Sequence, residues 1–159
     1  MTRRMIRWST LAIAALLLTT ACSGIGALRA DQLSIVTPGE LSSVQLPVTL
    51  QWRGDHLPAS VSQFAVFVDR GPMAPGDDVR SLVDDGCRRR RGCPDPGYLR
   101  GLGIYLTSDR SLVVPTLQTL GGLGAETARP VHEAVVVALD QQGRRVGEFS
   151  AIARFRFER

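Results

Sequence analysis

Five apolar residues recur at every second position in the first third of the chain, and this alternation restricts the possible folds more than any other feature. They are Val44, Leu46, Val48, Leu50 and Trp52, with Gln45, Pro47, Thr49 and Gln51 between them. Because successive side chains of a strand point to opposite faces, a period of two predicts a half-buried β-strand. Pro47 has no N–H to donate to a ladder, so we expect this strand to be bulged there or to lie at a sheet edge.

Several later segments also have the composition of strands. They are 64–68, 103–107, 112–114 and 131–139, followed by a turn at 140–143 and a last strand at 146–157. Segments 64–68 and 131–139 are apolar on both faces, which predicts central, buried strands. Beyond the N-terminal leader, no stretch keeps a helical period over three turns. The sequence therefore predicts an all-β domain of about seven strands, arranged as a sandwich of two sheets.

The chain begins with a basic and then apolar leader. Arg3, Arg4 and Arg7 precede an apolar run from Trp8 to Leu18. As a helix, that run would span only roughly 17 Å, whereas the hydrocarbon core of a bilayer is about 30 Å thick. The leader is therefore interpreted as a cleaved signal peptide rather than a membrane anchor.

The leader ends in the run Leu18-Thr19-Thr20-Ala21-Cys22, which resembles the lipobox of bacterial lipoprotein precursors. The resemblance implies that the Cys22 thiol receives a diacylglyceryl group carrying chains such as palmitate. It also implies cleavage between Ala21 and Cys22. Two acyl chains suffice for a stable membrane anchor, so we expect an extracytoplasmic, lipid-anchored protein of the cell envelope. The alternative is an ordinary secretory signal cut after Ala21, with Cys22 incidental.

Cleavage at this point would leave 138 of the 159 residues, a length typical of one domain. We expect a signal peptide at 1–21, a lipidated cysteine and tether at 22–32, and a β-sandwich domain at 33–159. Loss of the three leader arginines leaves 16 of the 19 basic residues against 15 acidic ones. This near-neutral balance removes the main support for nucleic-acid binding.

Two segments of the predicted domain resemble a known fold family. The opening IVTPGELSSVQLPVTLQW and the closing HEAVVVALDQQGRRVGE resemble the first and last strands of immunoglobulin-like and fibronectin-III-like domains on bacterial surface proteins. The resemblance implies an immunoglobulin-like β-sandwich. It also implies a role in binding or spacing rather than in catalysis.

With Cys22 acylated, Cys87 and Cys93 are the remaining cysteines. An even pair in an oxidising compartment predicts a disulfide. It would close a seven-residue loop and contribute on the order of 2 kcal/mol to stability. A zinc or redox pair is the alternative, but five residues separate the two cysteines and neither histidine is nearby in the sequence.

The region at about 70–101, called the insert below, has no regular period. Loops of this length in a compact domain are usually functional or disordered. Four consecutive arginines lie between its two cysteines: Arg88, Arg89, Arg90 and Arg91. They predict a salt-sensitive docking tip for an anionic envelope polymer, lipid headgroups or an acidic protein face. The alternative is an exposed loop whose arginines pair with Asp77, Asp78, Asp84 and Asp85.

Other candidate sites carry weaker signals. Six aspartates in or beside the insert offer oxygen ligands for calcium, but their spacing fits no calcium loop. They are Asp69, Asp77, Asp78, Asp84, Asp85 and Asp95. The only histidines are His56 and His132; we expect His132 to be a satisfied residue at the rim of a strand rather than a metal ligand. Tyr98 and Tyr105 are interpreted as packing residues, with a sugar-stacking surface as the alternative.

No nucleophile-elbow pattern occurs in the sequence. We therefore predict a non-enzymatic protein without a cofactor or metal, which binds or assembles at the cell envelope through Arg88, Arg89, Arg90 and Arg91. Two alternatives remain open: an envelope hydrolase or metal-binding accessory protein, and a purely structural spacer.

Overall fold

The structure, a computed structural model, describes residues 33–115 and 131–158. These residues belong to one compact unit, Asp31–Arg159. The predicted signal peptide, Cys22 and the tether lie outside the described residues. Among the residues that are described, no helix is both long enough and apolar enough to cross a membrane.

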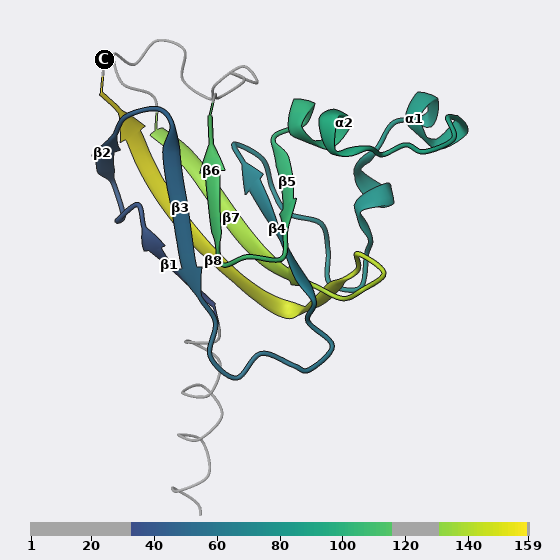
Figure 1. Cartoon of the computed structure of the whole chain (residues 1–159), viewed down its shortest axis with the longest axis horizontal. Helices are drawn as coiled ribbons and strands as arrows, with labels where there is room; N and C mark the ends of the chain where they lie inside the picture. The colour runs from purple at the N-terminus through teal and green to yellow at the C-terminus, as the bar shows by residue number, and fades with distance from the viewer. Residues whose placement is uncertain (1–32, 116–130, 159) are drawn as a thin grey trace, which may run out of the picture. The chain divides into compact units, whose positions relative to one another are not determined.

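Two β-sheets form the main body of the described domain (Figure 1). The three-stranded sheet has the order β1-β3-β6, from β1 (Ser34–Thr37), β3 (Val48–Arg53) and β6 (Ser111–Val114). The five-stranded sheet has the order β2-β8-β7-β4-β5, from β2 (Ser42–Val44), β8 (Arg145–Phe157), β7 (Val131–Leu139), β4 (Gln63–Val68) and β5 (Ile104–Thr107). Neighbouring strands are antiparallel except for the parallel pair β2 and β8.

The strands at 64–68, 103–107, 112–114, 131–139 and 146–157 are confirmed, with small differences at their ends. The single strand expected from Val44 to Trp52 is wrong: the segment divides into β2 and β3, which belong to different sheets. Pro47 lies in the break, as a residue without an N–H donor would. Leu46 is 47% exposed, so its place in the alternation does not bring it into the core. The described residues therefore form eight strands rather than the expected seven or so.

The space between the two sheets holds the larger apolar core. From the five-stranded sheet, β4 and β7 contribute every second residue, including Phe64, Val66 and Val136. From the opposite sheet, Leu50 and Trp52 pack against them, and the Trp52 and Phe64 rings meet edge to face at 5.5 Å. The alternation around Trp52 thus marks the face that is buried between the sheets.

The other face of β4 and β7 is buried by the insert. Phe67 and Val137 on this face form a second core with Met73 and Leu99, which belong to the insert. A strand with one face against the opposite sheet and the other against a covering segment is apolar throughout. This arrangement explains why 64–68 and 131–139 lack any alternation.

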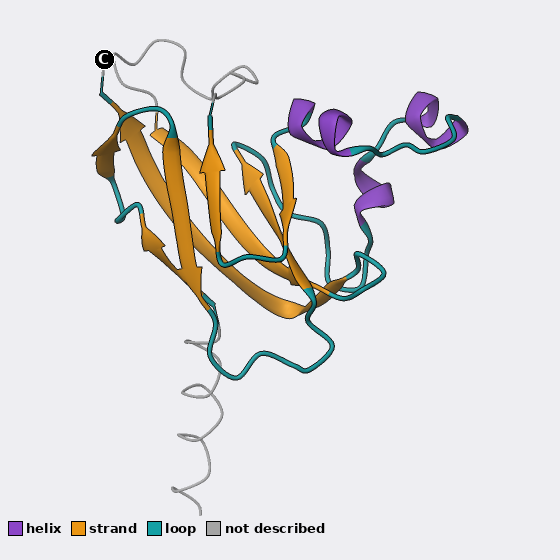
Figure 2. Ribbon diagram, viewed as in Figure 1, coloured by secondary structure: helices purple, strands orange, loops and turns teal. Residues whose placement is uncertain are grey.

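The insert lies in the connection between β4 and β5 and contains the described helices, so the all-β expectation is corrected to a mostly β domain (Figure 2). A 3-10 turn, η1 (Val79–Leu82), is followed by two short α-helices, α1 (Asp85–Arg89) and α2 (Pro96–Gly101). Helices of five or six residues are too short to show a helical period in the sequence. Such short helices are also unstable alone, so the rest of the insert must hold them.

Candidate functional site

Each of the three helical segments in the insert begins at an aspartate. The carboxylate of Asp78 accepts from the Arg80 amide at 2.8 Å, at the start of η1. Asp84 accepts from the Cys87 amide at 2.7 Å and Asp95 from the Tyr98 amide at 2.9 Å. N-caps of this kind satisfy backbone donors that a short helix leaves free. Three of the six aspartates considered as calcium ligands, Asp78, Asp84 and Asp95, thus serve as helix caps.

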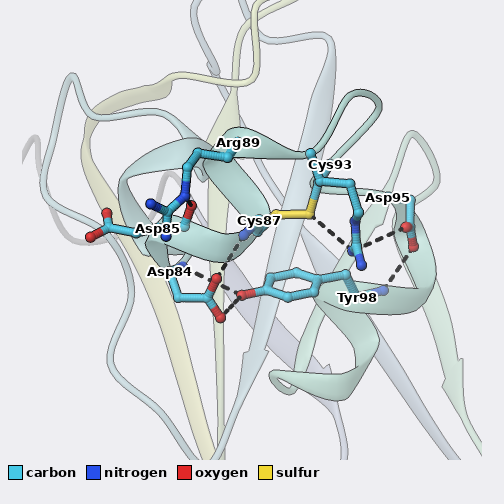
Figure 3. The surroundings of a disulfide bond; sticks show 8 residues. Asp84, Asp85, Cys87, Arg89, Cys93, Asp95 and Tyr98 are labelled. Atoms are coloured by element: carbon cyan, nitrogen blue, oxygen red, sulfur yellow. Dashed lines mark hydrogen bonds and ion pairs between the residues drawn. A yellow bond between two sulfur atoms is a disulfide. The ribbon is translucent and has the colours of Figure 1, made fainter.

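The predicted disulfide between Cys87 and Cys93 is confirmed (Figure 3). Cys87 lies on α1 and is 3% exposed, and the two Cα atoms are 5.3 Å apart. The bond ties the middle of α1 to the segment that leads into α2. The four arginines therefore lie on a short closed loop whose base is fixed.

A tyrosine joins the two α-helices at the base of this loop (Figure 3). The Tyr98 hydroxyl, from α2, donates to Asp84 Oδ2 at 2.9 Å and accepts from the Asp84 amide at 3.4 Å. The Cys87 amide, followed by the Tyr98 hydroxyl, lowers the pKa of Asp84 below its ordinary value of 3.8. Asp84 is therefore ionised at neutral pH and links α1, α2 and the disulfide.

Two of the four arginines interact with Asp85 on the same helix. Arg88 Nη1 is 3.4 Å from Asp85 Oδ1, and Arg89 Nε donates to the Asp85 carbonyl at 3.1 Å. The side chains of Arg88 and Asp85 are 54% and 81% exposed, so this ion pair is solvated and contributes little to stability.

The remaining two arginines differ from each other. Arg90 Nη2 lies 4.0 Å from Asp95 Oδ2 and 3.4 Å from Cys93 Sγ. Its guanidinium carbon is 6.0 Å from the centroid of the Tyr98 ring. Arg91 is exposed, and within residues 33–115 and 131–158 it forms neither an ion pair nor a side-chain hydrogen bond.

The expected neutralisation of the arginines by nearby aspartates is thus found only in part. Asp85 is close to Arg88, as that alternative required, but Arg90 pairs with Asp95. Asp84 is engaged by amides and by Tyr98 instead. The surface formed by Arg88, Arg89, Arg90 and Arg91, called the arginine tip below, keeps all four side chains exposed.

A depression of about 430 Å³ lies beside the arginine tip. Its lining residues are Arg80, Val83, Arg88, Cys93 and Pro94. Arg80 comes from η1 and Arg88 from α1, so the fold brings two arginine residues to one hollow. Sequence reasoning missed Arg80 because it lies outside the cysteine loop. An aspartate two residues before it, typical of a helix cap, is the signal that could have placed it.

The insert is attached to the sheet at several points away from the arginine tip. The backbone of Asp77 accepts from the Arg145 amide at 2.8 Å, and Gly76 donates to the Arg145 carbonyl at 3.0 Å. The Arg145 side chain donates to the Met73 carbonyl at 2.6 Å, and burial lowers the pKa of its guanidinium. Arg70 donates to the Leu102 carbonyl at 3.3 Å and so joins the two ends of the insert.

His132 is buried at the start of β7 and has a partner, which confirms the expectation of a satisfied rim residue. Its Nδ1 lies 2.7 Å from Asp69 Oδ2. The second carboxylate oxygen of Asp69 accepts from the Glu133 amide at 3.0 Å. His132 also stacks on Phe155 and meets Phe157 edge to face. Asp69, directly after β4, thus links the end of β4 to the start of β7. Sequence reasoning missed this role.

The two histidines lie at opposite ends of the five-stranded sheet. His132 opens β7, while His56 precedes β4, whose first residue pairs with the last residue of β7. Within the described ranges, no three histidine, cysteine, aspartate or glutamate side chains are grouped so that they could hold a metal ion. Tyr98 points to α1, whereas Tyr105 on β5 packs against the core between the sheets.

The arginine tip and the adjoining depression offer guanidinium donors to an anion, on a frame fixed by caps, a disulfide and an apolar base. Comparison with known proteins adds no assignment. No family model matches the chain, and neither a curated protein nor a solved structure resembles it at a significant level.

Proposed function

We propose that this protein is a lipid-anchored component of the cell envelope that binds an anionic polymer or an acidic protein face through its arginine tip. The observation that carries the proposal is the display of four exposed arginines on a disulfide-closed loop. The role is binding or assembly rather than catalysis. The anchor is a diacylglyceryl group on Cys22, at the end of the lipobox-like run.

The strand order supports an immunoglobulin-like sandwich as the scaffold. In immunoglobulin domains, strands A, B and E share one sheet, and strands C, F and G share the other. Here β1, β3 and β6 take the places of A, B and E, and β4, β7 and β8 those of C, F and G. The insert then lies between strand C and the next strand, β5. Domains of this architecture commonly present binding loops at the ends of their sheets.

The electrostatics of the arginine tip favour an external anion. A solvated pair such as Arg88 and Asp85 holds an arginine weakly, so a multivalent anion can compete for it. Planar guanidinium groups match both phosphate and carboxylate geometry. Arg80 and Arg88 both line the depression, so a phosphate or carboxylate group that entered it would be near two positively charged residues.

The test is binding of the full chain to two polyanions, polyphosphate and polygalacturonate, across a salt series. We expect saturable binding at low salt that weakens steeply as salt rises, because exposed charges are screened. Replacing Arg88, Arg89, Arg90 and Arg91 together by glutamine should weaken binding at least about tenfold. The matched control replaces the exposed Arg53 and Arg110, outside the insert, by glutamine and should bind as the wild type does. If the tip variant bound as tightly as the wild type, or if binding did not depend on salt concentration, the proposal would be contradicted and a structural spacer favoured.

The anchor is tested separately by fractionation. Wild-type chain is expected in the membrane fraction with labelled acyl chains, whereas Cys22→Ala is expected to lose both the label and the membrane association. Retention of Cys22→Ala in membranes would show that another element holds the protein there.

A further inference from the structure

One side of the sandwich is open within the described residues, and this side is independent of the arginine tip. The two sheets end there at β5 and β6, each of which pairs with a single neighbour. The chain passes from β5 to β6 through residues 108–110 without adding a strand to either edge. Seen in Figure 1, β5 and β6 run beside each other without forming a common sheet.

The hydrogen-bond alternation shows which backbone groups face outward at β6. The Trp52 amide donates to the Arg110 carbonyl at 3.1 Å, and Leu50 lies opposite Leu112 in the same register. In an antiparallel ladder, residues that bond to the neighbouring strand alternate with residues whose N–H and C=O point away from it. Ser111 and Val113 are therefore the residues whose backbone groups point away from β3, toward the open side.

A groove of about 280 Å³ lies along this open side. Its lining is mainly apolar and comes from three elements, α2, β5 and β6, together with the residue after β6: Pro96, Leu99, Arg100, Ile104, Tyr105, Leu106, Leu112, Val113 and Pro115. Leu106 is 38% exposed and Val113 is 54% exposed. An exposed edge of this kind, with apolar side chains and outward backbone groups, is a template for another strand.

The groove has one charged lining residue. Arg100, from α2, is exposed, and in the part of the chain that the structure describes no carboxylate pairs with it. Burial raises the pKa of the Tyr105 hydroxyl, and the Arg100 charge acts on it in the opposite direction. The two polar groups are thus close enough to interact electrostatically at one part of an apolar groove. The positive charge of Arg100 in an apolar groove complements a carboxylate on an otherwise apolar partner.

We propose that this groove binds an extended segment of a partner protein, which pairs with the edge of β6 that is open among residues 33–115 and 131–158 and places an acidic residue at Arg100. Main-chain hydrogen bonds to Ser111 and Val113 would add a fourth strand to the three-stranded sheet, while alternate side chains enter the groove. A lone acyl chain would use the apolar lining but would leave these backbone groups unused.

The test uses a displayed library of random short peptides, selected against the full chain. Val113→Pro is the counter-selection target, since it removes one outward N–H at an edge where proline is tolerated. Enriched peptides are expected to alternate apolar and polar residues and to carry an aspartate or glutamate. Their synthetic forms should bind the wild type in fluorescence anisotropy and lose at least about tenfold in affinity for Val113→Pro, with Val113→Thr as the control that keeps the N–H.

The charge is tested with a second matched pair. Arg100→Glu should weaken peptide binding at least about tenfold, whereas Arg110→Glu, on the turn outside the groove, should not. Circular dichroism checks that all variants stay folded. The proposal would be overturned if no peptide were enriched over the counter-selection target. It would also be overturned if Val113→Pro and Arg100→Glu bound the peptides as tightly as the wild type does. A dimer in sedimentation that Val113→Pro converts to monomer, without peptide binding, would make a second copy the occupant and overturn it as well. None of these variants alters the arginine tip, so failure here leaves the polyanion assay unaffected.

Discussion

The sandwich and the insert are stabilised in different ways. The sandwich is built from strands whose apolar residues meet across two sheets, as in the cluster that includes Leu50, Val136 and Phe155. The insert has helices of five and six residues, each started by an aspartate, plus one disulfide and a few apolar anchors. The comparison indicates that the insert depends on the sheet for its position and on its own polar and covalent contacts for its local shape.

This difference separates anchoring from display. Met73 and Leu99 hold the insert on the outer face of the five-stranded sheet. The arginine tip lies on the disulfide-closed loop of the insert, away from these two anchors in the sequence, and its side chains are exposed. A charged surface can therefore be presented without burying any of its arginines, which would carry a large desolvation cost. Changes in the two regions should then have separable effects.

The largest effect is expected in the sandwich core. Phe155 is fully buried between the sheets, so Phe155→Ala should lower the free energy of unfolding by roughly 3–5 kcal/mol. Ile152→Ala, at a 53% exposed position on the same strand, should change it by less than about 0.5 kcal/mol. Urea unfolding followed by far-UV circular dichroism measures both. Similar losses for the two variants would contradict the assignment of the buried face.

A smaller and more local effect is expected at the base of the insert. Leu99 is 2% exposed and packs on the sheet, and Leu99→Ala should cost roughly 2–3 kcal/mol, because the covering segment can partly relax. Hydrogen exchange should rise more in 70–101 than in β7. Uniform exchange across the domain would show that the insert and the sandwich unfold together.

Removal of the disulfide should affect the insert next. The double variant Cys87→Ala/Cys93→Ala opens a seven-residue loop, which should cost about 2 kcal/mol. The strands should keep their circular dichroism signal, because the bridge joins two residues within the insert. Loss of the β-sheet signal in this variant would mean that the insert contributes more to the sandwich than its contacts indicate.

The capping carboxylate predicts a pH dependence confined to the insert. The folded-state pKa of Asp84 lies below its ordinary value of 3.8, so its stabilisation is present above that value and is lost as pH falls through the lower, folded pKa. Amide protection in α1 should decline over this acidic range in the wild type. Asp84→Asn should lack that component, while Asp109→Asn, between β5 and β6, should retain it. If Asp84→Asn lost amide protection in acid as the wild type does, the Asp84 cap would not be the cause of this pH dependence.

The smallest effect on stability is expected at the arginine tip. Arg91 is exposed and lacks a side-chain partner within the described residues, so Arg91→Glu should change the free energy of unfolding by less than about 0.5 kcal/mol. The same variant should weaken polyanion binding. A loss above about 1 kcal/mol, measured by urea unfolding, would show that Arg91 has a structural role as well.

Much of the sandwich was predictable because its signals are local. Period-two alternation and runs apolar on both faces placed the strands at 64–68, 131–139 and 146–157 close to their observed ends. The alternation from Val44 to Trp52 misled at one point only, where Pro47 divides it into strands of two sheets. No local rule could assign Val44 to a parallel neighbour at the far end of the chain, since that pairing depends on β8.

The insert was less predictable, although some of its signals were present. Aspartates before the segments that begin at Val79, Asp85 and Pro96 are typical N-cap positions, and a proline often opens a helix. These signals are weak over five or six residues, so a helical period could not support them. The disulfide was predictable because the two cysteines have few alternative partners.

By itself, the sequence determined the positions of most strands, the pairing of Cys87 with Cys93 and the exposure of four charged side chains, because periodicity, cysteine number and charge act over short distances. Only the tertiary structure decided that the insert covers β4 and β7, that Arg80 joins Arg88 at one hollow, and that a groove remains between β5 and β6. Each of these features depends on contacts between segments far apart in the chain, and the order of strands in the sheets sets which segments meet.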